Sequence, residues 1–454
     1  MMKKKFDFDL IVIGGGNAGC EAALIAAEHK LKVAIIEANK WGGSNLNYSN
    51  IPLGALFEAT QLLKIAVDGS RFGLSSSSLR YNFPTLRSWK NLAMERAGAD
   101  DKTKLEEAGI VCIEGRGHLI SAHEVSDGED IYRTKKILLA TGAGMLDTGI
   151  NIPEGVKYLL PSDVPDLMRP PKTVFIVGAG ATGCELAQYL RTLGSEVVLA
   201  DYAARLLPRK DEEVGQVLDD LFAESGIKVL TQSRVTSIVN DNGMRKVIFL
   251  RGGLEKSVRV DEVILCTGSA PNTDIGLENA GVEYNAHGVI VDNEMRSSVK
   301  HIYACGDICG GESSLERSSL QAKIAARMII NKGKVQNNEV GMIRITKIYP
   351  EIAEIGLTED DCIRQDRRFK KAVLPLGEVA KSNIADFSDG FIKVLADKKG
   401  KIIGATIMAP NAGILIQELA FAMRHDMTLA DIAETPHLTN DWSELVRQAC
   451  AQLV

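Results

Sequence analysis

Residues 9–19 read Asp-Leu-Ile-Val-Ile-Gly-Gly-Gly-Asn-Ala-Gly, an apolar strand-like run that leads into a G-x-G-x-x-G turn. A helix-like run follows over residues 20–29, and residues 32–37 form a second apolar run that ends in a carboxylate, Glu37. A strand, a glycine turn, a helix and a second strand in this order are typical of a Rossmann-type unit that binds a dinucleotide.

Each glycine of this turn has a physical role. Gly14 permits the tight turn, Gly16 lets the backbone approach a pyrophosphate, and Gly19 lets the helix and the strand pack closely. The free N–H groups of the helix N-terminus then face the phosphates. At the end of the second strand, Glu37 is placed to hydrogen-bond a ribose.

The same pattern occurs a second time. Residues 173–183 read Thr-Val-Phe-Ile-Val-Gly-Ala-Gly-Ala-Thr-Gly, a helix is expected over 184–194, and residues 196–201 predict a strand that ends in Asp201. Its three glycines are Gly178, Gly180 and Gly183. Two complete patterns in one chain predict two bound dinucleotides. A carboxylate at position 201 pairs with the 2′-hydroxyl of NAD and repels the 2′-phosphate of NADP, so we expect NADH.

Composition bounds the remaining possibilities. The chain has 454 residues, too many for one core, and 45% hydrophobic and 25% charged residues are ordinary for a soluble α/β protein. A formal charge of -6 argues against a nucleic-acid partner. No uninterrupted apolar run reaches membrane-spanning length, so we expect no membrane insertion and a cytoplasmic protein.

The eight cysteines are scattered, with no Cys-x-x-Cys pair and no spacing typical of metal ligands, so no metal site is predicted. In a reducing compartment such residues act as small buried hydrophobes. Cys305 and Cys309 are the exception to consider, because only three residues separate them.

Residues 41–54, Trp-Gly-Gly-Ser-Asn-Leu-Asn-Tyr-Ser-Asn-Ile-Pro-Leu-Gly, resemble the redox-active segment of the flavoprotein disulfide reductases (the class I pyridine nucleotide-disulfide oxidoreductases), with dihydrolipoamide dehydrogenase the closest in pattern. In that family two cysteines stand where this chain has Asn45 and Asn50, and a lysine stands where it has Gly54. An amide neither forms a disulfide nor attacks one. The resemblance therefore implies a reductase that has lost the family's disulfide.

A second departure lies near the C-terminus. Residues 437–444, His-Leu-Thr-Asn-Asp-Trp-Ser-Glu, resemble the family segment that completes the partner subunit's active site. Thr439 takes the place of the catalytic histidine, whereas Glu444, its carboxylate partner in the family, is kept. His437 matches a non-catalytic histidine, and we interpret it as a packed or surface residue.

The resemblance covers essentially the whole chain and implies an α/β homodimer with two Rossmann-type dinucleotide-binding domains and a C-terminal α+β interface (dimerisation) domain. The expected spans are an FAD-binding domain over 1–150, an NAD-binding domain over 151–272, the second part of the FAD-binding domain over 273–338, and the interface domain over 339–454. It implies FAD contacts by Gly14, Gly16, Gly19, Glu37, Gly43, Ser44, Gly117, Thr141, Gly142 and Asp307, and NAD(H) contacts by Gly178, Gly180, Gly183, Asp201 and Gly268.

The missing lysine bears on Glu185. In the family this lysine pairs, beside the flavin, with a glutamate that follows the second glycine turn, here Glu185. Without that cation a buried Glu185 should have a raised pKa and become a candidate proton donor. The alternative is that Glu185 has found another partner or faces water.

Three functions remain open. The first is an FAD-dependent NADH oxidoreductase that passes electrons directly to a small acceptor, for which a quinone is favoured. Asn45, Asn50 and Thr439 would then bind the acceptor and Glu444 would supply a proton, unless the asparagines only cap helices. The second is a soluble pyridine-nucleotide transhydrogenase, against which Asp201 counts. The third is a non-catalytic redox sensor or complex subunit. Oxygen is a minor alternative acceptor.

Overall fold

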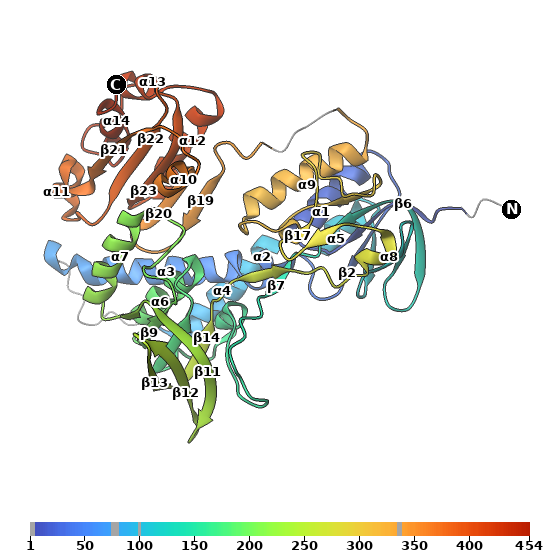
Figure 1. Ribbon diagram of the computed structural model, residues 1–454, viewed down its shortest axis with the longest axis horizontal. Helices are drawn as coiled ribbons and strands as arrows, with labels where there is room; N and C mark the ends of the chain where they lie inside the picture. The colour runs from blue at the N-terminus through green and yellow to red at the C-terminus, as the bar shows by residue number, and fades with distance from the viewer. Residues whose placement is uncertain (1–4, 74–80, 99–100, 334–337) are drawn as a thin grey trace. The chain divides into compact units, whose positions relative to one another are not determined.

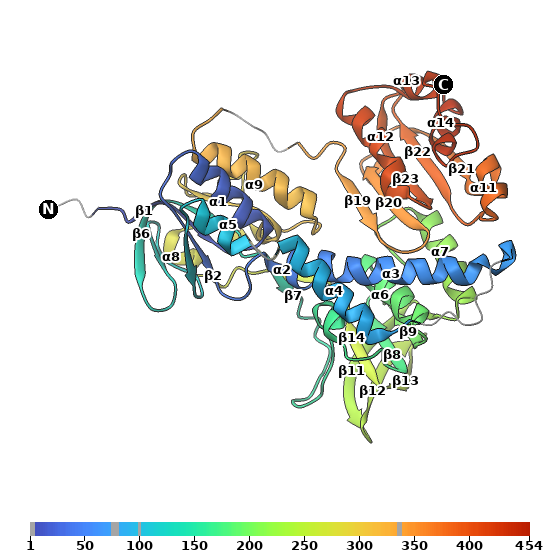
Figure 2. The same ribbon diagram turned by 180° about the vertical axis from the view of Figure 1, so that it is seen from behind.

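The computed structural model describes residues 5–73, 81–98, 101–333 and 338–454. The chain divides into two compact units by its internal contacts, and Figures 1 and 2 colour it by residue number. Unit 1 takes its residues from 1–56, 84–147 and 268–338, and unit 2 from 57–83, 148–267 and 339–454. Within the described ranges, no helix combines the length and apolar character needed to cross a bilayer.

Unit 1 is built on a parallel sheet with the strand order β3-β2-β1-β6, and β18 also pairs with β6. The short strands β4 and β5 extend it in antiparallel fashion. The bounds are β1 Phe8–Ile13, β2 Val33–Glu37, β3 Val111–Glu114, β4 His118–Ser121, β5 Glu124–Ser126, β6 Ile131–Leu139 and β18 Ile302–Ala304. The continuous apolar run of β1 is explained by burial of both of its faces.

Both faces of this sheet are covered. Leu10 and Val12 pack with helices α1 and α9, which lie side by side (Figures 1 and 2). Ile11 and Ile13 point to the opposite core, because successive strand residues alternate between faces. The other elements are α1 Asn17–Glu28, α2 Gly43–Asn47, α3 Asn50–Asp68, α4 Phe83–Gly98, α5 Asp101–Glu107, β7 Ala143–Met145, β15 Ser269–Pro271, α8 Leu277–Ala280, β16 Tyr284–Asn285, β17 Gly288–Val289, η3 Asp307–Cys309 and α9 Leu315–Ile329; α3 and α4 continue across the unit boundary.

The middle part of unit 2 repeats the strand-turn-helix theme. Its parallel sheet has the order β10-β9-β8-β14, beside an antiparallel sheet β11-β12-β13. The bounds are η1 Gly69–Phe72, η2 Pro161–Asp166, β8 Thr173–Val177, α6 Ala181–Thr192, β9 Glu196–Ala200, α7 Glu212–Glu224, β10 Lys228–Leu230, β11 Ser233–Asp241, β12 Met244–Arg251, β13 Leu254–Val260 and β14 Glu262–Leu265.

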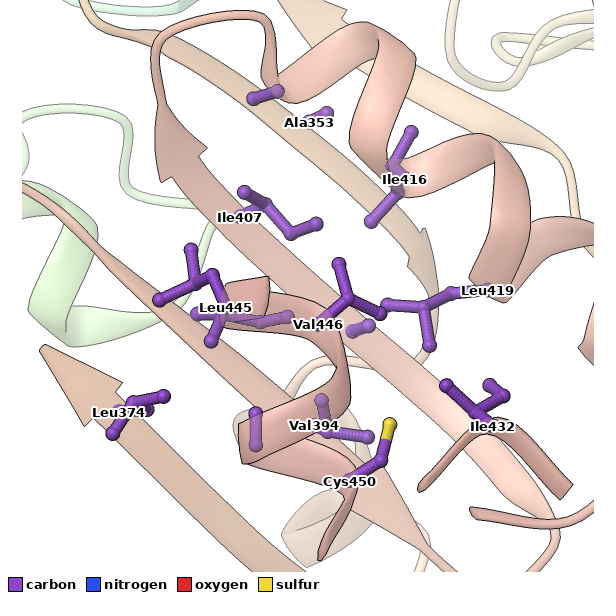
Figure 3. Packing of buried hydrophobic residues seen from close by; sticks show 14 of the residues in the cluster. Ala353, Leu374, Val394, Ile407, Ile416, Leu419, Ile432, Leu445, Val446 and Cys450 are labelled. Carbon is purple, nitrogen blue, oxygen red and sulfur yellow. The ribbon is translucent and has the colours of Figure 1, made fainter. Parts of the chain in front are cut away.

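The C-terminal part of unit 2 is an antiparallel sheet, β19-β20-β23-β22-β21, packed against helices. Figure 3 shows this core, in which Ile407 and Val394 of the sheet face Leu419 of α12 and Val446 of α14. The bounds are β19 Ile343–Thr346, β20 Glu351–Gly356, α10 Glu359–Arg364, β21 Lys370–Pro375, η4 Leu376–Glu378, α11 Ala380–Ala385, β22 Phe391–Ala396, β23 Ile402–Ala409, α12 Ala412–Arg424, α13 Leu429–Glu434 and α14 Ser443–Ala451.

The predicted α/β class is confirmed, but both fingerprint helices begin earlier than expected. Helix α1 starts at Asn17 and α6 at Ala181, whereas the sequence predicted starts at residues 20 and 184. The last glycine of each turn, Gly19 or Gly183, therefore lies inside the first helical turn. There the backbone N–H groups have no intrahelical partner, and a glycine costs little.

Candidate cofactor and redox site

The turn between β1 and α1 is closed by backbone contacts that exclude a side chain. Gly14 has φ +109°, and a Cβ there would lie 2.3 Å from the carbonyl oxygen of Ala140. A Cβ on Gly19 would lie 2.0 Å from the carbonyl oxygen of Gly14. At Gly16 the nearest atom to such a Cβ is 3.9 Å away, so this side of the turn is open to a pyrophosphate.

The turn between β8 and α6 repeats this geometry. Gly178 has φ +104°, and its Cβ would lie 2.3 Å from the carbonyl oxygen of Cys266. A Cβ on Gly183 would lie 1.9 Å from the carbonyl oxygen of Gly178, whereas nothing lies within 4 Å at Gly180. In both turns, therefore, the middle glycine (Gly16 or Gly180) has open space beside it for a ligand.

The acidic residues predicted to bind ribose are held by main-chain donors. Glu37 accepts hydrogen bonds from the N–H groups of Gly15 at 2.6 Å and Asn39 at 2.7 Å. Asp201 accepts from Ala179 at 2.6 Å and from the main-chain N–H of residue 203 at 2.8 Å. Each carboxylate oxygen has a further lone pair for a ribose hydroxyl.

Close backbone approach also explains Gly43 in unit 1. A Cβ on Gly43 would lie 2.7 Å from Cα of Gly16, so the two segments could not meet if residue 43 had a side chain. Ser44 beside it is exposed. Gly117 packs against Ile13, where a Cβ would lie 2.5 Å from Cγ2. These contacts shape the backbone around the first glycine turn.

The remaining candidates lie at strand ends. The Thr141 hydroxyl donates to the carbonyl oxygen of Asn272 at 2.8 Å. Gly142 and Gly268 have φ +70° and +103°, with open space beside them. Asp307, at the start of η3, accepts a hydrogen bond from the Ser313 hydroxyl at 2.7 Å.

Gln321 of α9 supports the site but belongs to no motif of the sequence. Its side chain is 1% exposed, and its Oε1 accepts a 2.9 Å hydrogen bond from the N–H of Gly306, the residue before Asp307. Gln321 therefore fixes the turn that presents Asp307. A glutamine inside a helix carries no local signal of such a contact.

The two asparagines in the positions of the family's cysteines differ from each other. Asn45 lies in α2, and its side-chain Oδ1 is buried without a hydrogen-bond partner in the described part of the chain. Asn50 is exposed and begins α3. The local backbone is instead held by Asn47, whose amide donates to the carbonyl oxygens of Trp41 and Gly43 at 2.8 and 3.0 Å. A buried acceptor without a donor is costly, so the Asn45 Oδ1 has bonding capacity for a ligand.

The C-terminal candidates lie on an exposed turn and the helix after it. Thr439 is exposed, and Glu444 in the first turn of α14 accepts a hydrogen bond from Gln448 at 3.0 Å. The side chain of His437 bonds the carboxylate of Glu418 and the carbonyl oxygen of Thr435. His437 therefore has local partners, as interpreted from the sequence.

Glu185 of α6 has found a new partner. Its Oε1 accepts a 2.7 Å hydrogen bond from the main-chain N–H of Lys347, in the connection between β19 and β20. Burial raises the pKa of Glu185 to about 7, and that hydrogen bond with the charges of Lys347 and Lys210 limits the rise. The carboxyl can thus carry or release a proton near neutral pH.

All eight cysteines are free thiols. Burial raises the pKa of Cys309 to about 12 and that of Cys305 well above its ordinary value. A thiol reacts as its thiolate, and the raised pKa keeps both thiols protonated at neutral pH. Neither residue is therefore suited to redox chemistry.

Comparison with known families decides the classification. Residues 8–328 match the model of the pyridine nucleotide-disulphide oxidoreductases, and residues 343–450 match the dimerisation domain of the same proteins. The chain belongs to the pyridine nucleotide-disulphide oxidoreductase family. The resemblance inferred from the sequence motifs is thereby confirmed.

Individual relatives of this oxidoreductase agree. A dihydrolipoyl dehydrogenase of Chlamydia pneumoniae is 31% identical, with 96% of each chain covered. A mercuric reductase of Bacillus cereus is 29% identical over 96% of this chain and 70% of its own length. The structure of LpdA from Mycobacterium tuberculosis superposes with a TM-score of 0.87 at 26% identity, covering 98% of this chain and 99% of its own.

Members of this family bind FAD and NAD(H). The residues of this oxidoreductase fit both cofactors. Each glycine turn keeps an open middle glycine beside a helix N-terminus, and each has a carboxylate with free lone pairs. The family resemblance assigns the first turn and Asp307 to FAD and the second turn to NAD(H), and this assignment stays a prediction.

Proposed function

We propose that this protein is a cytoplasmic, homodimeric NADH oxidoreductase that uses FAD, but no redox disulfide, to reduce a small acceptor directly, with a quinone as the favoured acceptor. The main support for this proposal is that asparagines, Asn45 and Asn50, replace both cysteines of the family, whereas both glycine turns keep the geometry needed to bind a dinucleotide. The matched dimerisation domain supports the homodimer.

Two features of unit 2 support NADH rather than NADPH. Asp201 places a negative charge where a 2′-phosphate would have to bind. The nearby cation that could neutralise such a phosphate, Arg205, is already engaged: its guanidinium contacts Asp360 at 2.9 Å and the carbonyl oxygen of Lys210 at 3.1 Å.

The reaction consumes one NADH, one quinone and one proton and yields NAD⁺ and a quinol. When bound, FAD supplies the two-electron relay between NADH and the acceptor. The glycine turns hold the two dinucleotides, and Asp201 orients the NADH ribose. As in the family, Asn45 and Asn50 of one subunit and Thr439 of the other subunit supply hydrogen bonds for the quinone oxygens. Glu185, or Glu444 of the other subunit, supplies the proton.

An anaerobic titration with NADH tests this function. We expect the visible absorbance of the flavin to bleach with about one equivalent of NADH, since all eight cysteines are free and form no disulfide that could take up a second pair of electrons. Adding a water-soluble quinone should restore the absorbance, whereas lipoamide or oxidised glutathione should not. Turnover of a disulfide substrate would contradict the proposal.

The same titration separates the alternatives. Reoxidation by NADP⁺ or its thio analogue would favour a transhydrogenase. Binding of NADH without bleaching would favour a redox sensor or a complex subunit. An unchanged response of an Asn45→Ala variant to the quinone would show that the amide does not bind the acceptor.

A further inference from the structure

A small pocket, open to solvent, lies inside unit 2. It is lined by residues of α3, α6 and the β19–β20 connection, among them Gln61, Lys64, Glu185, Gln188 and Lys347. The pocket thus joins an ionisable carboxyl to the solvent along a wall that is part polar and part aromatic.

Three hydrogen bonds attach α6 to the β19–β20 connection beside this pocket. Glu185 accepts from the N–H of Lys347 at 2.7 Å. One turn further along the helix, the Gln188 amide accepts from the N–H of Tyr349 and donates to its carbonyl oxygen, at 2.7 and 2.9 Å. Among the described residues, none donates a hydrogen bond to the second oxygen of Glu185, which can therefore accept one from water or a reactant.

The charges near the Glu185 carboxylate come from several elements. Lys347 lies on the β19–β20 connection, Lys64 on α3, and Lys210 before α7. Lys64 and Lys210 have their own carboxylate partners, Asp68 at 2.9 Å and the buried Glu354. The other titratable groups near Glu185 are Cys184, Tyr189, Cys266 and Tyr349. Lys347 is exposed, lines the pocket beside Glu185 and has no ion-pair partner in the described residues, so its ammonium is the unpaired cation of this pocket.

We propose that Lys347 is a positioning residue for Glu185, and that the pocket between α3, α6 and the β19–β20 connection is the route by which Glu185 exchanges its proton with solvent. The main-chain N–H of Lys347 fixes the carboxylate at the pocket wall, and its ammonium group stabilises the ionised form. The inference rests on the proposed function, in which each turnover takes up one proton.

In chemical terms Glu185 acts as a carrier. It takes a proton from a pocket water, gives it up as the hydride equivalents of NADH pass to the acceptor, and is reprotonated from the pocket. Glu185 forms no covalent bond to a substrate, and its carboxyl group is back in its starting protonation state at the end of each turnover. A cation in the pocket favours release, because it stabilises the carboxylate.

The test is the pH dependence of flavin reduction by NADH, followed anaerobically in a stopped-flow instrument. The wild type should show an inflection near pH 7, the pKa of Glu185. In Lys347→Met the inflection should move upward by about half to one pH unit, because the carboxylate loses a cation. Lys347→Arg should keep the wild-type profile, and Lys64→Met, a matched change in the same pocket, should leave it unmoved.

A second readout needs no turnover. The pKa of Glu185 is raised from 4.5 to about 7 in the folded protein, so stability falls as the pH rises between these values and levels off above them. The unfolding temperature should follow that course, Glu185→Gln should flatten it, and Lys347→Met should extend it to higher pH. Profiles of Lys347→Met that match the wild type, or an equal shift in Lys64→Met, would overturn the inference. Absence of flavin reduction in every protein would refute the proposed function, and the unfolding data would still decide the role of Lys347.

Discussion

Replacing Lys393 by methionine should lower the free energy of unfolding by about 3–5 kcal/mol, because it leaves the buried carboxylate of Asp211 without its cation. Lys393 of β22 is 1% exposed, and its ammonium contacts Asp211, Glu213 and Glu359 at 3.2, 2.8 and 2.7 Å. Methionine keeps most of the stem, so the loss reports on charge rather than on volume. Urea unfolding followed by circular dichroism measures the effect.

Lys371→Met is the matched control. Lys371 also contacts Glu359, at 2.7 Å, but its side chain is 46% exposed. We expect a loss below about 1 kcal/mol there, because exposed ion pairs contribute little. The Lys393→Met defect should also shrink as the pH falls from 8 to 5, since protonation relieves the repulsion among the three carboxylates. Equal losses for both variants would show that the burial of Lys393 does not matter.

Replacing, one at a time, the two acids that we expect to bind ribose should distinguish the two dinucleotide sites by their effects. Asp201→Ala should raise the KM for NADH about 10–100-fold, the loss expected for one or two hydrogen bonds to a charged group, and should leave the flavin content unchanged. Glu37→Ala should instead yield protein with less bound FAD. Each acid accepts a hydrogen bond from the equivalent main-chain N–H of its own glycine turn. The two variants therefore lose the same kind of local hydrogen bond.

Steady-state kinetics and the absorbance ratio of the purified protein give both readouts. Asp201→Ala should also narrow the preference for NADH over NADPH, because the charge that repels the 2′-phosphate is gone. Loss of flavin from Asp201→Ala together with intact flavin in Glu37→Ala would contradict the assignment of the two turns.

The sequence predicted the strands and glycine turns well, because their geometry follows from local rules. Gly14 and Gly178 must adopt positive φ against a neighbouring carbonyl, and only glycine does so without strain. The acids at positions 37 and 201 follow from the lengths of the strands that precede them. The predicted first residues of helices α1 and α6 differ from the observed ones by only three positions.

What the sequence could not predict are the partners from distant segments. Glu185 meets the N–H of a residue 162 positions away, and a main-chain donor leaves no mark in the sequence. Among the three asparagines of residues 45–50, the pattern did not reveal that Asn47 holds the backbone while Asn45 keeps an unbonded oxygen. Such choices depend on packing, which is settled only when the tertiary structure forms.

The ion-pair network of Lys393 and the hydrogen bonds of Gln188 join stretches of chain that lie far apart in sequence. Asp211 and Lys393 are 182 residues apart, and Gln188 and Tyr349 are 161 residues apart. Residues 148–267 and 339–454 should therefore open together rather than one after the other. In native-state hydrogen exchange, the slowest amides of β8 and β23 should share one opening free energy and one denaturant dependence. The nucleotide-binding half of unit 2 and its C-terminal sheet would then be a single cooperative folding unit, although residues 268–338, which lie between them in the sequence, belong to unit 1.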